Sequence, residues 1–91
     1  MAYRVEIGPA AIPQMEALDA VVAASIERKI VWLAENAETI LHRRLVGMLP
    51  ELQGLCKLRL GDYRVLYWIY HEQQLIRLYR VQHRSAVYRD F

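Results

Sequence analysis

Cysteine is nearly absent from this chain of 91 residues, in which Cys56 stands alone. No disulfide can therefore form within the chain, and no cysteine-based metal site is visible. The three histidines, His42, His71 and His83, belong to separate predicted elements without closely spaced carboxylates, so we find no plausible set of metal ligands. We expect a protein that uses neither a metal nor another cofactor, with Cys56 as a small core residue.

Long apolar runs are also missing. No run approaches the roughly 18 to 20 residues of a membrane span, and residues 1–7 alternate like a strand instead of resembling a signal peptide. Internal repeats, low-complexity tracts and linkers are lacking too. With 55% hydrophobic and 24% charged residues, the chain is expected to fold as a single domain over residues 1–91, in the cytoplasm and without a membrane partner.

The net charge of +2 is unevenly distributed along the chain. Residues 1–50 hold five Lys and Arg against six Asp and Glu, whereas residues 51–91 hold seven against four. A basic C-terminal half favours an anionic partner, such as nucleic acid or an acidic protein segment. On charge alone, a solvated basic face is the alternative interpretation.

The N-terminal part of the sequence predicts a strand followed by two helices. Alternation over residues 3–7 predicts the strand, and Pro9 opens a helix that Pro13 keeps short or irregular up to about Asp19. A second helix is predicted from about residue 20 to residue 38. Its buried stripe is formed by apolar residues spaced three and four apart, namely Val22, Ile26, Ile30 and Leu33.

The C-terminal part predicts strands. Residues 39–50 are expected to form a short helical turn and then a loop. Three strands follow, at about 54–60, 63–70 and 75–81, with joints of hairpin length at Gly61-Asp62 and at residues 71–74. The expected fold is α+β, with the N-terminal strand and a helical hairpin packed on one face of a small antiparallel β-sheet.

Cations lie at alternate positions of two predicted strands. Alternation places Lys57 and Arg59 on one face of their strand and Cys56, Leu58 and Leu60 on the other. The helices should cover the face that carries the aliphatic residues. In the next strand both faces are partly apolar, so the sequence does not decide which of them meets the core. If Arg64 joins Lys57 and Arg59 on the uncovered face, three cations form a phosphate clamp.

Such a clamp suits RNA cleavage through the 2′-hydroxyl, which needs a proton acceptor, positive charge for the phosphorane and a proton for the leaving 5′-oxygen. Arginine binds phosphate oxygens through its planar fork, and lysine can act as a base when neighbouring cations lower its pKa. Tyr88 could stack on an exposed base. The structural alternative is that Arg59 or Arg64 pairs with Asp62 or Glu51 at the surface, while Tyr88 covers the core edge.

His83 precedes Arg84 and could serve as an acid or contact the substrate. Strand alternation, however, points the two side chains in opposite directions. A partly buried histidine without a catalytic role is the alternative interpretation of His83.

Two motifs give the sequence a resemblance to a known family. The run Leu-Gln-Gly-Leu-Cys-Lys-Leu-Arg-Leu-Gly-Asp-Tyr-Arg-Val-Leu-Tyr at 52–67 and the run Arg-Val-Gln-His-Arg-Ser-Ala-Val-Tyr-Arg at 80–89 resemble the RelE branch of the RelE/ParE toxin superfamily. The resemblance spans nearly the whole chain. It implies a cytosolic toxin of a type II toxin-antitoxin pair, with a RelB-like antitoxin as partner, that cuts mRNA in the ribosomal A site without a metal.

The resemblance also implies roles for individual residues. Arg64 matches the arginine that stabilises the scissile phosphate, Arg84 the one thought to help the leaving group, and Tyr88 the tyrosine that stacks on the mRNA. Lys57 matches a basic residue implicated in activating the 2′-hydroxyl. The best-known RelE has a second lysine where this chain has Leu55, so a weaker or altered nuclease is compatible with the pattern. Arginine has a pKa above about 12, so Arg84 would act chiefly by charge.

Two other functions are compatible with the same fold. A ParE-like toxin poisons DNA gyrase and needs no RNA-cleaving residues, although that branch usually lacks the pair that Arg84 and Tyr88 form. A toxin that has lost its activity could instead join its antitoxin only to repress their operon. Substituting Arg64, Arg84 and Tyr88 is expected to discriminate between these functions.

Overall fold

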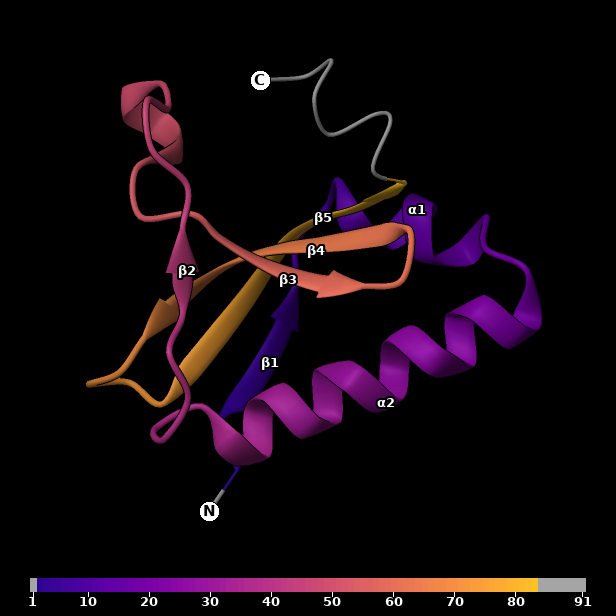
Figure 1. Cartoon of the computed structure of the whole chain (residues 1–91), viewed down its shortest axis with the longest axis horizontal. Helices are drawn as coiled ribbons and strands as arrows, with labels where there is room; N and C mark the ends of the chain where they lie inside the picture. The colour runs from indigo at the N-terminus through magenta and orange to yellow at the C-terminus, as the bar shows by residue number, and fades with distance from the viewer. Residues whose placement is uncertain (1, 84–91) are drawn as a thin grey trace.

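A five-stranded sheet in the order β1-β5-β4-β3-β2 frames the computed structural model, which describes residues 2–83 (Figure 1). The elements in chain order are β1 (Arg4–Ile7), α1 (Ala11–Glu16), α2 (Ala20–Asn36), β2 (Arg43–Arg44), the 3₁₀ turn η1 (Pro50–Leu52), β3 (Cys56–Leu60), β4 (Tyr63–Tyr70) and β5 (Leu75–His83). The predicted α+β class is confirmed.

The N-terminal strand lies within the sheet, at its edge. β1 runs parallel to β5, with Arg4 opposite Leu75 and Ile7 opposite Leu78, whereas the other neighbouring strands are antiparallel. The sheet is therefore mostly antiparallel. Where β1 ends, the Gly8 N–H donates to the Leu78 carbonyl at 2.9 Å. A Cβ at Gly8 would lie 2.6 Å from that carbonyl oxygen, so this close approach requires glycine.

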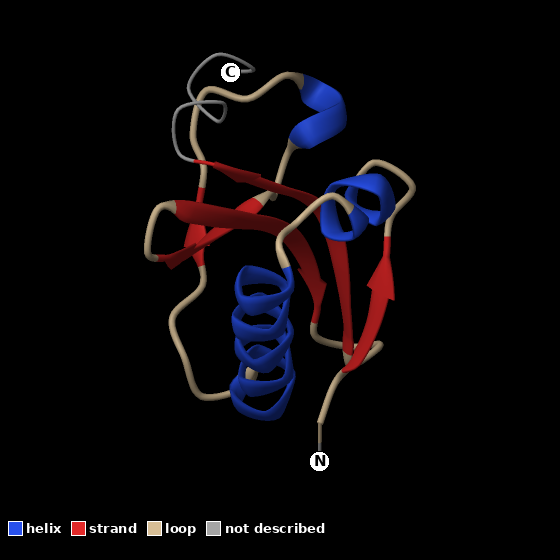
Figure 2. Cartoon of the chain, turned by 90° about the vertical axis from the view of Figure 1, so that its right-hand side faces the viewer, coloured by secondary structure: helices blue, strands red, loops and turns tan. Residues whose placement is uncertain are grey.

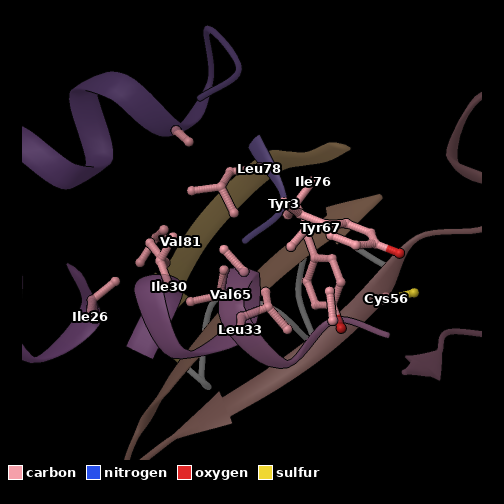
Figure 3. Close-up of a cluster of buried hydrophobic side chains, with 13 residues drawn as sticks. Tyr3, Ile26, Ile30, Leu33, Cys56, Val65, Tyr67, Ile76, Leu78 and Val81 are labelled. Atoms are coloured by element: carbon pink, nitrogen blue, oxygen red, sulfur yellow. The ribbon is translucent and has the colours of Figure 1, made fainter. Parts of the chain in front are cut away.

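The long helix α2 covers one side of the curved sheet (Figure 2). The predicted stripe is confirmed, because Ile26, Ile30 and Leu33 are buried and Val22 packs beside them. In Figure 3 the side chains of Ile26, Ile30 and Leu33 meet core residues of β4 and β5, which are Val65, Tyr67, Ile76, Leu78 and Val81. The other helix, α1, is short as predicted from its prolines, and its Ala11 joins the same core.

The segment between α2 and β3 differs from its prediction. Residues 39–50 contain the short strand β2 in place of a helical turn, and Arg43 pairs with Lys57. His42 explains the difference, because its Nε2 bonds the Ala37 carbonyl at 2.7 Å and its Nδ1 bonds the Tyr67 hydroxyl at 2.6 Å. The contact with Tyr67 of β4 and the pairing of Arg43 with Lys57 hold the chain along the edge of β3. None of the helices in residues 2–83 is both long and apolar enough to cross a membrane.

Candidate functional site

The two faces of β4 carry different side chains. Tyr63, Val65, Tyr67 and Ile69 belong to the core beneath α2, so Arg64, Leu66, Trp68 and Tyr70 point to the opposite side. In the pairing of β3 with β4, Arg59 lies opposite Arg64 and Lys57 lies opposite Leu66. Directly opposed residues of an antiparallel pair share a face. The structure thus places Lys57, Arg59 and Arg64 on one side of the sheet, which we call the cationic face.

The three cations differ in exposure. Arg59 is exposed, Lys57 is half-buried and Arg64 is only 4% exposed. Nη1 of Arg64 donates to the carbonyls of Gly61 at 3.0 Å and Tyr63 at 2.9 Å. These bonds hold the guanidinium against the β3–β4 turn. Both bonds come from Nη1 of the same guanidinium.

Carboxylates do not neutralise these cations within residues 2–83. In this part of the chain the ion pair is between Arg4 and Glu6, at 3.8 Å, and Lys57, Arg59 and Arg64 form none. The alternative pairing of Arg59 or Arg64 with nearby acids is therefore not seen there. Like charges directly opposite one another destabilise a sheet, so an anion bound at the Arg59–Arg64 pair would relieve their repulsion.

The remaining predicted residues lie elsewhere. His83 pairs with Tyr63 on the helix-covered side of the sheet, where their rings meet edge to face with centroids 5.4 Å apart. His83 is exposed at the end of β5, contrary to the partly buried alternative, and it does not join the cationic face. Arg84 and Tyr88 lie outside the described residues.

Sequence reasoning overlooked an aromatic pair on the cationic face. The rings of Trp68 and Tyr79 lie 5.2 Å apart between centroids, and both line a groove of about 580 Å³. Alternation along β4 puts Trp68 on the same face as Arg64. Alternation along β5 likewise puts Tyr79 on the face opposite the core residue Leu78, but only the pairing of β4 with β5 brings its ring against Trp68.

Cys56, in β3, has a thiol whose ionisation is disfavoured by the core around it. Burial raises the pKa of the Cys56 thiol, and the neighbouring Arg44 only partly offsets that rise. The thiol is completely buried and contacts the Gly54 carbonyl at 3.4 Å, which confirms it as a core residue. Residues 2–83 hold no cluster of three or more His, Cys, Asp or Glu side chains arranged for a metal ion.

Comparisons with known proteins agree with this architecture. The family described as the ParE toxin of the type II toxin-antitoxin system parDE matches residues 5–88. A toxin-antitoxin complex, RelBE2 from Mycobacterium tuberculosis, contains a chain 26% identical to this one, with a TM-score of 0.76 and coverage of 93% of this chain and 94% of that one.

Two further structures share the fold. Free Escherichia coli RelE carrying two substitutions is 24% identical, with a TM-score of 0.73 and coverage of 94% of this chain and 87% of that one. RelE from the Pyrococcus horikoshii RelE-RelB complex is 22% identical, with a TM-score of 0.71 and coverage of 93% and 98%. A comparison by sequence with curated proteins found no match.

Proposed function

The chain belongs to the RelE/ParE superfamily of type II toxin-antitoxin toxins, and from that premise we propose that it is an mRNA endoribonuclease that acts at the ribosome, inhibits translation and arrests growth. The observation that carries the proposal is the cationic face. Arg59 and Arg64 oppose each other on adjacent strands, Lys57 lies beside them, and no carboxylate of residues 2–83 pairs with any of the three.

The proposed reaction is attack of a 2′-hydroxyl on the adjacent phosphate. It expels the 5′-oxygen of the next nucleotide and leaves a 2′,3′-cyclic phosphate and a 5′-hydroxyl. The negative charge that develops on the phosphorane is stabilised best by donors held in place beforehand. Arg64 has that character, because its hydrogen bonds to Gly61 and Tyr63 fix its guanidinium.

The other roles follow the family motif. Lys57 activates the 2′-hydroxyl or stabilises its anion, and Arg59 contacts a phosphate of the same strand. Arg84 supports the leaving oxygen by charge and Tyr88 stacks on a base, although both lie outside the described residues. His83, on the other face, meets the substrate only if the RNA passes the end of β5. The reaction needs no metal in this proposal.

The test is primer extension on a reporter mRNA incubated with purified protein, with and without translating ribosomes. The proposal predicts cuts that require ribosomes and that disappear in Arg84→Ala and Arg64→Lys variants. Arg4→Ala is the matched control, because Arg4 is an exposed arginine at the opposite edge of the sheet. Folded, growth-arresting protein that makes no cuts in either condition would contradict the proposal.

Gyrase poisoning is the second candidate, and the match of the ParE toxin family to residues 5–88 favours it. The RelE chains that share the fold favour the first. The candidates separate in a DNA supercoiling assay with gyrase. Inhibition of supercoiling that survives Arg64→Lys and Arg84→Ala would replace the nuclease proposal, since the gyrase reaction does not need these residues.

We also propose a RelB-like antitoxin as the cognate partner. Two of the similar structures are complexes of a RelE-type toxin with its antitoxin. An amphipathic antitoxin segment with acidic side chains would neutralise Arg59 and Arg64 if laid over the cationic face, or would cover the helices and leave those cations open. Protection of Arg59 from arginine-specific modification in the complex, but not in the free toxin, distinguishes the two arrangements.

A further inference from the structure

The groove beside the Trp68–Tyr79 pair is a second feature of the cationic face. It measures about 580 Å³ and lies between the β1–α1 loop and the segment from Glu51 to Gly54. Protein pockets that take small ligands measure about 300–1,000 Å³, so one nucleotide fits. The phosphate-handling cations of the proposed function lie on the same face.

Trp68 is held in place as a platform. Its indole Nε1–H donates to the Gln53 carbonyl at 3.0 Å, and a Cβ built on Gly54 would lie 3.8 Å from the indole Cδ1. The indole nevertheless remains half-exposed. A stacking surface whose orientation is already fixed loses little conformational entropy when a ligand binds.

Tyr79 lies on this face because it follows the core residue Leu78 in the alternation along β5, and the strand becomes irregular at this point. Leu66 pairs with Arg80 and Tyr67 pairs with Leu78, so Tyr79 is an extra residue with no partner in the register. A bulge of this kind re-aims side chains and occurs preferentially next to functional sites. Here the Tyr79 ring lies against Trp68, and the bulge places Arg80, opposite Leu66, beside it on the same face.

Positive charge accompanies the aromatic rings. Arg77, which is paired with Trp68 in the register, and Arg44 both line the groove, and Glu51 is the single carboxylate among the described residues that do. The guanidinium of Arg80 lies 5.2 Å from the centre of the Tyr79 ring. Aromatic rings flanked by cations are the combination with which proteins bind single-stranded nucleic acid, stacking the bases and attracting the backbone.

We propose that this groove binds one unpaired base of the RNA, stacked on Trp68 and Tyr79, on the same face of the sheet as the phosphate held at Arg64. The inference rests on the proposed function, because it extends the path of the same RNA strand. It makes Trp68 and Tyr79 binding residues that position the message, with no part in the chemical step.

The two tryptophans of the chain allow a direct test with purified protein. Trp68 lies in the groove, whereas Trp32 lies on α2 and lines a separate hollow that Lys57 and Arg59 also line. The probe is a short RNA with 2′-O-methyl groups, which cannot be cleaved. We expect it to quench the fluorescence of the Trp32→Phe variant, in which Trp68 alone emits, more strongly than that of the Trp68→Phe variant, because only Trp68 stacks on a base.

An abasic oligonucleotide of the same length and charge separates stacking from charge attraction. Loss of one stacked base weakens binding by about five- to 150-fold, so we expect the abasic probe, Trp68→Leu and Tyr79→Leu each to raise Kd in that range. Trp32→Leu is the matched control and should leave Kd unchanged. Equal affinity for the abasic and intact probes, or quenching only in Trp68→Phe, overturns the inference.

The outcome is independent of cleavage. Quenching of Trp68 by the uncleavable RNA, from protein that makes no cuts in mRNA, supports the groove and contradicts the nuclease. If a Trp68→Leu variant cleaves mRNA normally and its Kd for the probe is unchanged, the proposed binding of a base in the groove is wrong and the nuclease proposal is unaffected. Competition for Trp68 by an antitoxin peptide, with no response to RNA, assigns the groove to a protein partner and also overturns the inference.

Discussion

The two faces of the sheet are built from alternate residues of the same strands, yet they differ in the chemical character of their side chains. Beneath α2, side chains such as Leu33, Val65 and Tyr67 form a continuous apolar core. On the cationic face, Arg59 opposes Arg64 without a carboxylate partner in residues 2–83. The helix-covered face therefore supplies folding free energy, and the cationic face retains an unfavourable charge arrangement that suits an anionic ligand.

Breaking the helix-covered face should have the largest effect on stability. Leu33 is completely buried in α2, so Leu33→Ala is expected to lower the free energy of unfolding by about 2–5 kcal/mol. Val31, 57% exposed on the same helix, provides the control, and Val31→Ala should stay within about 0.5 kcal/mol. Urea unfolding measures both. Similar losses for the two variants would contradict the assigned helix orientation.

Removing the fixed arginine should have the largest effect on cleavage. Arg64→Ala is expected to slow mRNA cleavage by about 100- to 1,000-fold, the usual cost of losing one preorganised donor to developing negative charge. Single-turnover cleavage by folded protein measures the rate. Because the substitution also removes two bonds to the β3–β4 turn, Arg64→Lys must be measured beside it. A variant with lysine that cleaves at the normal rate would contradict the role of the guanidinium fork.

Substitution of Arg59 should separate an effect on cleavage from an effect on stability most clearly. Arg59→Ala is expected to reduce cleavage about tenfold, because one charge-assisted phosphate contact is lost. Its unfolding free energy should change by no more than about 0.5 kcal/mol, with any change towards higher stability because a like-charged pair is relieved. Thermal unfolding and cleavage rates measured on the same sample provide the comparison. Marked destabilisation would show that Arg59 serves the fold.

A smaller effect is expected from pH, on the helix-covered face. Burial raises the pKa of the Tyr67 phenol above its ordinary value of 10.0. The folded state therefore keeps a proton that the unfolded chain loses, and stability falls as pH rises above about 10. Tyr67→Phe should make that fall shallower, measured by urea unfolding between pH 8 and 11. At neutral pH it should cost about 1–3 kcal/mol, since the His42 Nδ1 loses its partner.

The control for this pH effect is Tyr70→Phe, because Tyr70 is 40% exposed on the other face. A slope that is equally shallow in both variants would mean that burial of Tyr67 is not the cause. The comparison again contrasts a side chain inside the core with one outside it.

Residue spacing was enough to predict much of this arrangement. Period-two alternation placed Lys57 and Arg59 opposite the core strand face, and the helical spacing of Ile26, Ile30 and Leu33 predicted the buried stripe of α2. Both patterns reflect contacts with a single neighbouring layer. Local sequence therefore carries them.

Features that depend on distant partners could not be predicted in this way. The parallel pairing of β1, the strand at Arg43–Arg44 and the bulge at Tyr79 each require the position of another strand. The near-complete burial of Arg64 likewise depends on how the turn and its surroundings pack. The aromatic groove was missed for the same reason, because its walls also include the β1–α1 loop and residues of 51–54, which are distant from Trp68 and Tyr79 in the sequence.

The most direct test of the account is the chemistry of the RNA ends left on a message cut in the presence of ribosomes. Attack by the 2′-hydroxyl on a phosphate held by Arg64 predicts a 2′,3′-cyclic phosphate on the upstream fragment and a 5′-hydroxyl on the downstream one. Arg4→Ala should give the same ends in the same amount, and Arg64→Ala should give almost none. Fragments with 5′-phosphates, or equal yields from the two variants, would contradict the cationic face as the site of RNA cleavage.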